Sequence, residues 1–338
     1  MKKNKFLSII ISFVLVFSFA FTNISSAAQA PAYSPTSSIS SGSYMYYAVY
    51  GEIYKVNTNT KKTTLVKSID DKSVCDLTVS NGWIYFTAND AGKASKYKPY
   101  IYRVRTNGKD MKKLTKGDNP VIYNDKIYYR KINFNNYTTY DYDIIGIYRM
   151  SLSGTSDKCI KKSSTVDEFI VYKSKIYYVT YSASTHKTYL RRISLTGENP
   201  KIMTSSTNCS LSDLKAYSDY IYFNYNDDIY KIKTTSTSKY KVVSNAEMRD
   251  LSSGYIYYTT YKNDYFYIYK MNLSSKTKTF IKKIYTLGDV KVSNGYMILS
   301  YFYESGYNSE FDRYMYNYVK YICDTNGKNG KILNRYYV

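Results

Sequence analysis

Hydrophobic and polar positions along this chain repeat in one short pattern. An apolar–aromatic run such as Ile127-Tyr128-Tyr129 is followed by a loop, a second run such as Ile147-Tyr148-Arg149-Met150, a Gly-containing turn and a lysine-rich segment. β-Branched and aromatic residues dominate the runs, as is typical of strands. The copies recur every 35 to 49 residues and align on the second residue of the first run: Tyr46, Tyr85, Tyr128, Tyr177, Tyr222, Tyr257 and Ile298.

Repeats of about 40 residues that contain several strands are typical of β-propellers. We name the strands of one repeat A to D: A precedes the first turn (Asp76 to Ser80), B and C are the aromatic runs, and D is the lysine-rich segment (Met111 to Thr115). No helical periodicity follows the N-terminal segment. The sequence therefore predicts an all-β propeller of seven four-stranded blades over residues 35–338. Six blades are the alternative, because the seventh copy is degenerate at Met297-Ile298-Leu299.

Tight turns are predicted between strands A and B and between strands C and D. Asn81-Gly82 and Asn107-Gly108 are hairpin signals, because Asn and Gly accept positive φ. A thin sheet is stabilised in a ring by packing between two neighbours, so we expect the tyrosines of strands B and C in the core. We also expect the C-terminal residues 335–338 to add an edge contact that closes the ring.

The first 28 residues have the layout of a secretory signal peptide. Three lysines precede an uncharged run from Phe6 to Phe21, and small residues follow it. Cleavage is expected after Ala28, an uncleaved anchor being the alternative, and residues 29–34 then form a short linker. No second run of membrane length follows, so we expect a mature chain without a membrane span, secreted or held at the cell surface.

The net charge is strongly positive. The 48 Lys and Arg residues exceed the 26 Asp and Glu residues, which gives +22, or 22 − 3 = +19 after loss of the leader. The bias toward Lys, Asn, Ile and Tyr is typical of a low-GC genome and indicates a Gram-positive-like bacterium, but it does not explain the shortage of acids. A positive field favours anionic partners such as wall polymers, acidic polysaccharides or nucleic acid, and a non-specific surface charge is the alternative.

Four cysteines fall in four different repeats: Cys75, Cys159, Cys209 and Cys323. Distant blades of a ring do not approach to disulfide distance, and no C-x-x-C spacing indicates zinc. We therefore expect four small buried side chains, with no metal and no cofactor.

The Ile-Tyr-Tyr run, the Ile-Tyr-Arg-Met run, the Ser-Gly turn and the paired lysines together resemble the repeats of exported bacterial propellers of unknown function, which are grouped with low-density-lipoprotein-receptor-like propellers. Lys112-Lys113-Leu114-Thr115 followed by Asn119-Pro120-Val121 is also similar to repeats of TolB-type propellers. The resemblance covers nearly all of the mature chain and implies the propeller fold, but it implies no activity and no catalytic residues. Receptor-type repeats carry Trp and Asp after the first Tyr. This chain has Tyr129 and Thr180 at such places, so receptor-like ligand binding is not implied.

A binding site is predicted at one end of the ring. In an up-and-down meander, the short A–B and C–D turns lie at one end and the B–C connections at the other. The B–C connections are long in blades 2, 3 and 7, over Ala88 to Pro99, Asn133 to Asp143 and Tyr303 to Tyr318, and loops on a rigid scaffold often carry function. Exposed Tyr with Lys and Arg suits stacking on sugars and pairing with anions, and ordinary solvated loops are the alternative. The candidate binding residues are Lys93, Lys96, Tyr97, Lys98, Tyr137, Tyr140, Tyr142, Tyr307, Arg313, Tyr314 and Tyr316.

Catalytic signals are weak. The single histidine, His186, has no carboxylate partner evident in the sequence, and the pairs Asp141/Asp143 and Asp227/Asp228 lack the spacing of a Ca²⁺ loop. Phosphate-cradling glycine loops, H-E-x-x-H and G-x-S-x-G are absent. We therefore expect no catalytic residues and no enzyme.

The leading hypothesis is an exported, monomeric, non-catalytic propeller that recognises an anionic wall polymer, a polysaccharide or a surface protein through its B–C face. Nucleic acid ranks below these partners because no motif supports it. Two alternatives stay open. A glycan-cleaving hydrolase or lyase predicts carboxylates clustered around the ring axis, and a structural scaffold predicts assembly into an exported complex.

Overall fold

The computed structural model describes residues 43–90, 98–134, 142–207, 209–308 and 313–337. These ranges contain 26 strands, β1 to β26, and no helix. It follows that this part of the chain has no helix with the length and apolarity needed to cross a membrane. The expected leader, the linker and residues 35–42, the start of the predicted propeller, lie outside the described ranges.

Within each sheet the strands pair antiparallel with their chain neighbours, and their order along the sheet follows the chain. The first sheet has three strands, β1 (Tyr44–Val49), β2 (Glu52–Asn57) and β3 (Thr63–Ser68). The second has seven, β4 (Lys72–Ser80), β5 (Trp83–Asp90), β6 (Tyr100–Arg105), β7 (Lys112–Tyr123), β8 (Lys126–Phe134), β9 (Tyr142–Ser151) and β10 (Lys158–Lys162).

Four sheets of four strands follow. They contain β11 (Val166–Tyr172), β12 (Lys175–Ser182), β13 (Lys187–Ser194) and β14 (Lys201–Thr207); then β15 (Leu211–Tyr217), β16 (Tyr220–Tyr225), β17 (Asp228–Lys233) and β18 (Lys239–Val243); then β19 (Glu247–Ser252), β20 (Tyr255–Lys262), β21 (Tyr265–Asn272) and β22 (Lys278–Ile284); and last β23 (Thr286–Ser293), β24 (Tyr296–Asn308), β25 (Arg313–Asp324) and β26 (Lys331–Tyr337).

Strand β7 belongs to two blades. Its first part, Lys112 to Lys116, pairs with β6, and its second part, Gly117 to Tyr123, pairs with β8. The seven-stranded sheet is therefore two four-stranded units in which strand D of one continues directly into strand A of the next. The described strands thus make one three-stranded and six four-stranded units.

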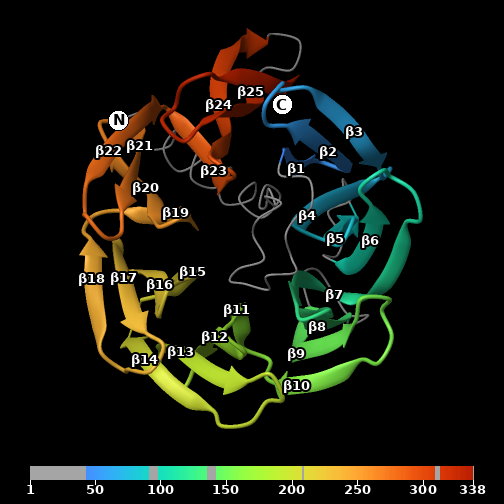
Figure 1. Ribbon diagram of the computed structural model, residues 1–338, viewed down its shortest axis with the longest axis vertical. Helices are drawn as coiled ribbons and strands as arrows, with labels where there is room; N and C mark the ends of the chain where they lie inside the picture. Colours follow the sequence, from blue (N-terminus) through green and yellow to red (C-terminus); the bar gives the residue numbers. More distant parts are fainter. Residues whose placement is uncertain (1–42, 91–97, 135–141, 208, 309–312, 338) are drawn as a thin grey trace.

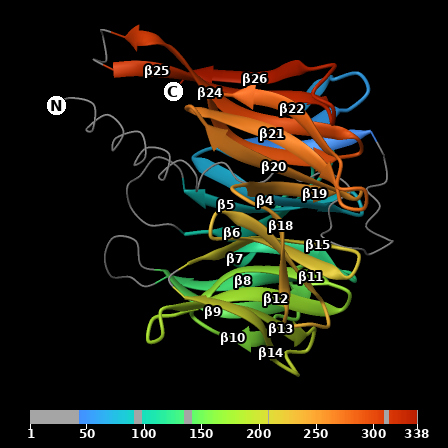
Figure 2. The same cartoon turned by 90° about the vertical axis from the view of Figure 1, so that its left-hand side faces the viewer.

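These units form a closed ring, which confirms the predicted all-β propeller (Figure 1; Figure 2). Seven hydrophobic clusters of described residues lie between neighbouring units, one at each boundary. At one boundary Tyr177 packs against Phe223. The last unit packs on the first through Tyr318 and Tyr47. Seven boundaries favour the seven-blade count over six.

The tyrosines of strand B fill these clusters, as predicted. Tyr47, Tyr85, Tyr128 and Tyr178 are almost completely buried. Most tyrosines of strand C are only half-buried: Tyr54, Tyr148, Tyr189 and Tyr230. The blades fan out from the axis, so a strand farther from it is covered less by the neighbouring blade (Figure 1).

The A–B turns have the predicted chemistry. Asn81 and Gly82 join β4 to β5 with φ of 49° and 75°, the left-handed values that a type I′ hairpin requires. The described C-terminal residues do not form the expected edge contact between the last blade and the first. Arg335 to Tyr337 pair with β25 and form the end of strand D in the last unit. Strands β26 and β1 lie in separate sheets. Among the described residues, the last blade and the first are therefore joined by side-chain packing.

All four cysteines are free. Cys75 and Cys323 are buried, as expected, but Cys159 is exposed and Cys209 is partly exposed. The expectation of four buried side chains is wrong for these two. Cys159 lies in β10, an outer strand that a neighbouring blade covers little.

Candidate functional site

The innermost strands of six blades are irregular in the same way. Strands β4, β7, β11, β15, β19 and β23 each shift register against their B strand. A β-bulge leaves backbone N–H groups without a ladder partner and bends the strand. These strands lie nearest the ring axis (Figure 1).

Acidic residues gather on these bulged strands. Eight of the 26 Asp and Glu residues of the chain lie there: Asp76, Asp118, Asp167, Glu168, Asp213, Glu247, Asp250 and Asp289. We call these eight residues the inner carboxylates. They are not among the site residues predicted from the sequence, although a signal exists: in four blades an acid stands five residues before the first residue of the A–B turn, as Asp76 does before Asn81. Asn119 takes that place in blade 3.

Several inner carboxylates join neighbouring blades. Oδ2 of Asp76 accepts a hydrogen bond from the backbone N–H of Asn119 at 3.2 Å. Oε1 of Glu168 accepts one from the N–H of Leu214 at 2.8 Å. Oδ2 of Asp250 accepts one from Val292 at 2.6 Å. Each bond runs from one blade to the next, so these carboxylates satisfy backbone donors at the blade boundaries.

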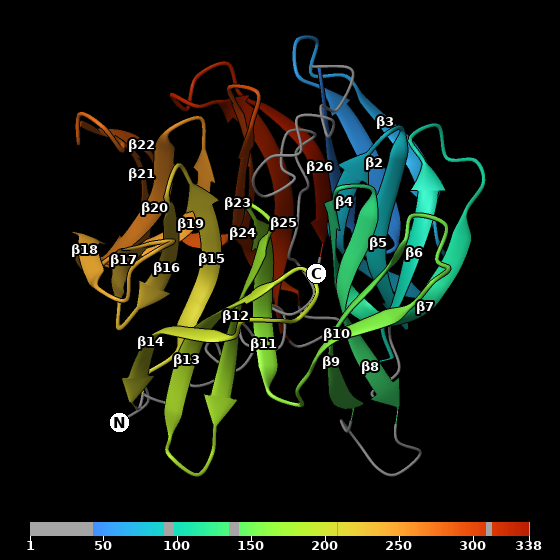
Figure 3. The same cartoon turned by 60° about the horizontal axis from the view of Figure 1, so that its bottom comes forward.

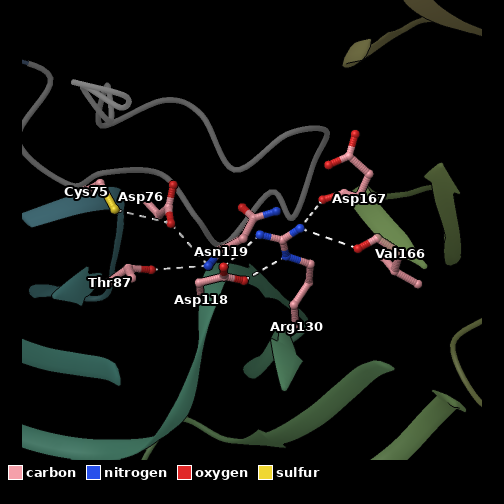
Figure 4. Close-up of polar contacts among 8 residues, drawn as sticks. All are labelled: Cys75, Asp76, Thr87, Asp118, Asn119, Arg130, Val166 and Asp167. Carbon is pink, nitrogen blue, oxygen red and sulfur yellow. Dashed lines mark hydrogen bonds and ion pairs between the residues drawn. The ribbon is translucent and has the colours of Figure 1, made fainter. Parts of the chain in front are cut away.

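Arg130 links blades 3 and 4 in a similar way (Figure 4). Its Nε and Nη2 donate to the two oxygens of Asp118, both at 2.7 Å, and its Nη1 donates to the carbonyl of Val166 at 3.4 Å and to that of Asp167. The side chain of Asp118 is 1% exposed and that of Arg130 15%. A bidentate pair this buried is held in one geometry.

Burial and mutual repulsion perturb the inner carboxylates. Burial, followed by the charge of Asp118, raises the pKa of Asp76 above its usual range. Burial, followed by the charge of Asp213, raises the pKa of Glu168 to about 7. Burial also raises the pKa of Glu247, outweighing the nearby Arg249. A carboxyl group with a pKa of about 7, as in Glu168, is able to exchange protons near neutral pH.

Blade 7 supplies cations to the same region. Burial disfavours the charged forms of Asp289 and Lys291, but their attraction outweighs it, so the pKa of Asp289 is lowered and that of Lys291 is raised. Lys320, 2% exposed, donates from Nζ to Oγ of Ser300 at 2.6 Å. Within the described ranges, no three His, Cys, Asp or Glu residues are arranged to hold a metal ion.

The outer strands have the opposite character. The D strands β3, β10, β14, β18, β22, β26 and the first part of β7 carry 15 basic side chains and no acidic one. They lie on the outside of the ring (Figure 1; Figure 3). We call this surface the basic rim. Its basic residues are Lys67, Lys112, Lys113, Lys116, Lys158, Lys161, Lys162, Lys201, Lys239, Lys241, Lys278, Lys282, Lys283, Lys331 and Arg335.

Five of the eleven predicted binding residues fall outside the described part of the chain. These are Lys93, Lys96, Tyr97, Tyr137 and Tyr140. Lys98 is described: it is half-buried, and its backbone N–H donates to Oδ1 of Asn89 at 2.6 Å. The other five lie in strands of which the backbone is described: Tyr142 in β9, Tyr307 in β24, and Arg313, Tyr314 and Tyr316 in β25.

The long loop predicted in blade 7 is wrong. Strands β24 and β25 continue through most of residues 303–318, with Tyr307 opposite Tyr314 and Asn308 opposite Arg313. The many aromatic residues there favour a long hairpin over an irregular loop. The two strands project beyond the neighbouring ones (Figure 2).

The remaining candidates from the sequence are His186 and the two aspartate pairs. His186 is exposed, and its Nδ1 lies 3.3 Å from the hydroxyl of Tyr181. Asp228 accepts a hydrogen bond from the N–H of Asn245 and pairs with Lys241 at 2.6 Å, so this carboxylate serves a turn. Of the pair Asp141/Asp143, the first lies outside the described residues.

No family model and no curated protein sequence matches this chain. Solved structures are similar in fold. A puromycin hydrolase matches with a TM-score of 0.64 and 10% identity over 93% of this chain and 57% of its own. A puromycin-hydrolyzing peptidase from Mycobacterium tuberculosis matches with a TM-score of 0.60 and 8% identity over 95% and 55%. A chain of a nidogen/laminin complex matches with 0.51 and 12% over 71% and 92%.

At these identities the likeness shows the propeller fold alone, and the chain spans a little over half the length of the two hydrolases. It supports a propeller, as the sequence resemblance implied, without singling out one repeat family. The prediction that this chain is not an enzyme is overturned, because similar structures include hydrolases as well as a chain from a binding complex. The fold therefore gives no ground for excluding catalysis.

Proposed function

We propose that this protein is exported and binds an anionic partner outside the cell, a wall polymer, a polysaccharide or an acidic surface protein. The observation that carries the proposal is the basic rim, where 15 basic side chains stand without one acidic neighbour on the same strands. The inner carboxylates lie on the opposite edge of each blade, so they neutralise the rim little. A surface of one sign attracts ligands of the other sign.

Exposed aromatic residues support the predicted B–C face as a second part of the binding surface, next to the basic rim. Tyr181 and Tyr261 are the next-to-last residues of their B strands and are 47% and 62% exposed. Tyr285, in the connection between strand D of blade 6 and strand A of blade 7, is 56% exposed. B–C and D–A connections share one end of a meander, so these rings stand at the end where the sequence places the binding loops.

The proposal is tested with matched charge variants. Lys113, Lys116 and Lys162 on the basic rim are changed to Gln in one protein, and Lys109, Lys126 and Lys328 near the A–B and C–D turns in another. The rim variant is expected to lose retention on immobilised polyphosphate and alginate, whereas the turn variant keeps it. Retention of the wild type should fall steeply between 0.05 and 0.5 M salt, because exposed charges are screened within about 10 Å at 0.1 M.

Equal losses in both variants would show that net charge alone matters and that the rim is not the binding surface. No retention of the wild type on either polymer at low salt would end the proposal.

A second candidate is a glycan-cleaving hydrolase or lyase, and the inner carboxylates favour it. Such enzymes use two carboxyl groups in different protonation states. The pKa of Glu168 is raised to about 7, partly by the charge of Asp213, so one such group has a second carboxyl group near it. Release of new reducing or unsaturated ends from a glycan panel, abolished in Asp213→Asn, would support this candidate. Release that survives both Asp213→Asn and Glu168→Gln would place any activity elsewhere.

A further inference from the structure

Blade 6 carries exposed aromatic rings at its outer edge. Tyr285 is 56% exposed and Phe280 is 52% exposed. Tyr265 and Tyr267 are half-buried, and Lys283 is exposed. We call these five residues the blade 6 patch. Large aromatic rings left open to water in one place mark a surface that a partner covers.

The strand register explains why these side chains meet. In the β21–β22 ladder, Tyr267 lies opposite Lys283, and Tyr269 lies opposite Phe280. Residues directly opposite each other in an antiparallel pair share a face of the sheet, and so do alternate residues along one strand. Tyr265, Tyr267, Phe280 and Lys283 are therefore presented on one face, and Tyr285 follows β22 by one residue.

The contacts within the patch hold the rings in place. The ring centroids of Tyr265 and Tyr285 lie 5.6 Å apart in an edge-on arrangement, and those of Tyr267 and Phe280 lie 6.3 Å apart. Nζ of Lys283 lies 3.6 Å from the ring centroid of Tyr265 and 5.6 Å from that of Tyr267. The ammonium group is thus fixed among the rings by cation–π attraction.

Charge complementarity indicates the chemistry of the partner. No carboxylate of the described residues forms an ion pair with Lys283. Lys278 and Lys282 on the same strand add to the positive field. The patch therefore offers one fixed cation beside flat apolar faces.

A sugar acid matches both features. The C–H face of a pyranose ring packs on an aromatic ring, and a carboxylate on the sugar pairs with an ammonium group. A polyanion without rings would use only the lysine. We propose that the blade 6 patch binds a polysaccharide that contains uronic acids, its rings on Phe280 and Tyr285 and a carboxylate on Lys283. This inference rests on the proposed binding of anionic partners and names one substrate class for it.

The test compares binding of alginate, polyphosphate, oligo(dT) and neutral dextran by calorimetry. The double variant Phe280→Ala/Tyr285→Ala is expected to bind alginate about tenfold more weakly than the wild type, since one or two stacking contacts are lost. Its binding of polyphosphate should stay unchanged, and dextran should bind neither protein. Lys283→Gln should also weaken alginate binding, with the rings intact.

The matched control is Ile202→Ala. Ile202 lies opposite Arg191 in blade 4, the place that Phe280 takes in blade 6, and is 47% exposed, so its loss should change no affinity. An unchanged melting temperature shows that each variant is folded. If the double variant does not fold, the single variant Tyr285→Ala replaces it in the test.

Unchanged alginate binding in the double variant, with polyphosphate still bound, would overturn the patch and leave the proposed function standing. Failure of the wild type to bind either polyanion would overturn the proposed function itself. A larger loss for oligo(dT) than for alginate would replace the sugar acid with a single-stranded nucleic acid.

Discussion

At the scale of single residues, the inner carboxylates connect chemistry to folding. Glu168 accepts the N–H of Leu214 across a blade boundary while Asp213 repels its charge. Glu168 thus stabilises the contact between its blade and the next, but its ionised form costs folding free energy. Buried carboxyl groups whose pKa is raised in this way are common at functional sites.

Glu168→Gln should change the pH dependence of stability. The pKa of Glu168 rises from an ordinary value of 4.5 to about 7 on folding, first through burial and then through Asp213. The folded chain therefore holds this proton more tightly between these two pH values, and the free energy of unfolding falls as pH rises through that window. Gln keeps an acceptor for Leu214 but carries no charge. The variant should melt several degrees above the wild type at pH 8 and close to it at pH 4.5.

The measurement is thermal unfolding at both pH values, with Glu198→Gln, an exposed carboxylate in the turn after β13, as the control. The same melting difference at pH 4.5 and pH 8 would contradict the assigned titration.

At the scale of elements, turns and bulges set each blade. Asn-Gly turns could be recognised from the sequence because the positive φ they need is a local property. The bulges could not, since a bulge is a mismatch between two strands and shows only when they are paired. The sequence predicted a loop in place of the β24–β25 hairpin for the same reason. Its residues have no clear strand pattern, so only the pairing of the two strands shows the hairpin.

Substitutions at two glycines distinguish backbone strain from a steric clash with a neighbouring strand. Gly82 in the A–B turn has φ of 75° and open space where a Cβ would stand. Gly146 in β9 has φ of 147°, and a Cβ there would lie 2.0 Å from the carbonyl oxygen of Lys161. Gly82→Ala should cost about 1–2 kcal/mol of backbone strain. Gly146→Ala should cost several times more, because the β9–β10 ladder must move.

Chemical denaturation of both variants measures the difference. Equal losses would mean that β10 shifts freely and that the outer ladder contributes little to the stability of the blade.

At the scale of the whole molecule, the ring closes through side chains of the described blades. Tyr47 of blade 1 is fully buried and packs with Ile298 and Tyr318 of blade 7. In a ring of thin sheets each boundary is needed, because a blade covered on one side only leaves its other apolar face in water.

Tyr47→Ala should therefore destabilise the protein by about 3–5 kcal/mol, the range for loss of a large buried ring. Limited proteolysis should then cut first in blades 1 and 7. Tyr240→Ala is the control, because this ring is 56% exposed, and it should change stability by less than about 0.5 kcal/mol. A Tyr47→Ala protein as stable and as resistant as the control would show that closure rests on other contacts.

The sequence by itself determined the repeat, the four-stranded unit, the A–B turns and the excess of positive charge, because each follows from residues close together in the chain. The tertiary structure decided where the charges stand. Acids from six blades meet near the axis and lysines spread over the rim, since each blade runs outward from the inner strand. It also brought Phe280 and Lys283 onto one face with Tyr265 and Tyr267, because pairing across two strands, and not spacing along one, selects which side chains touch.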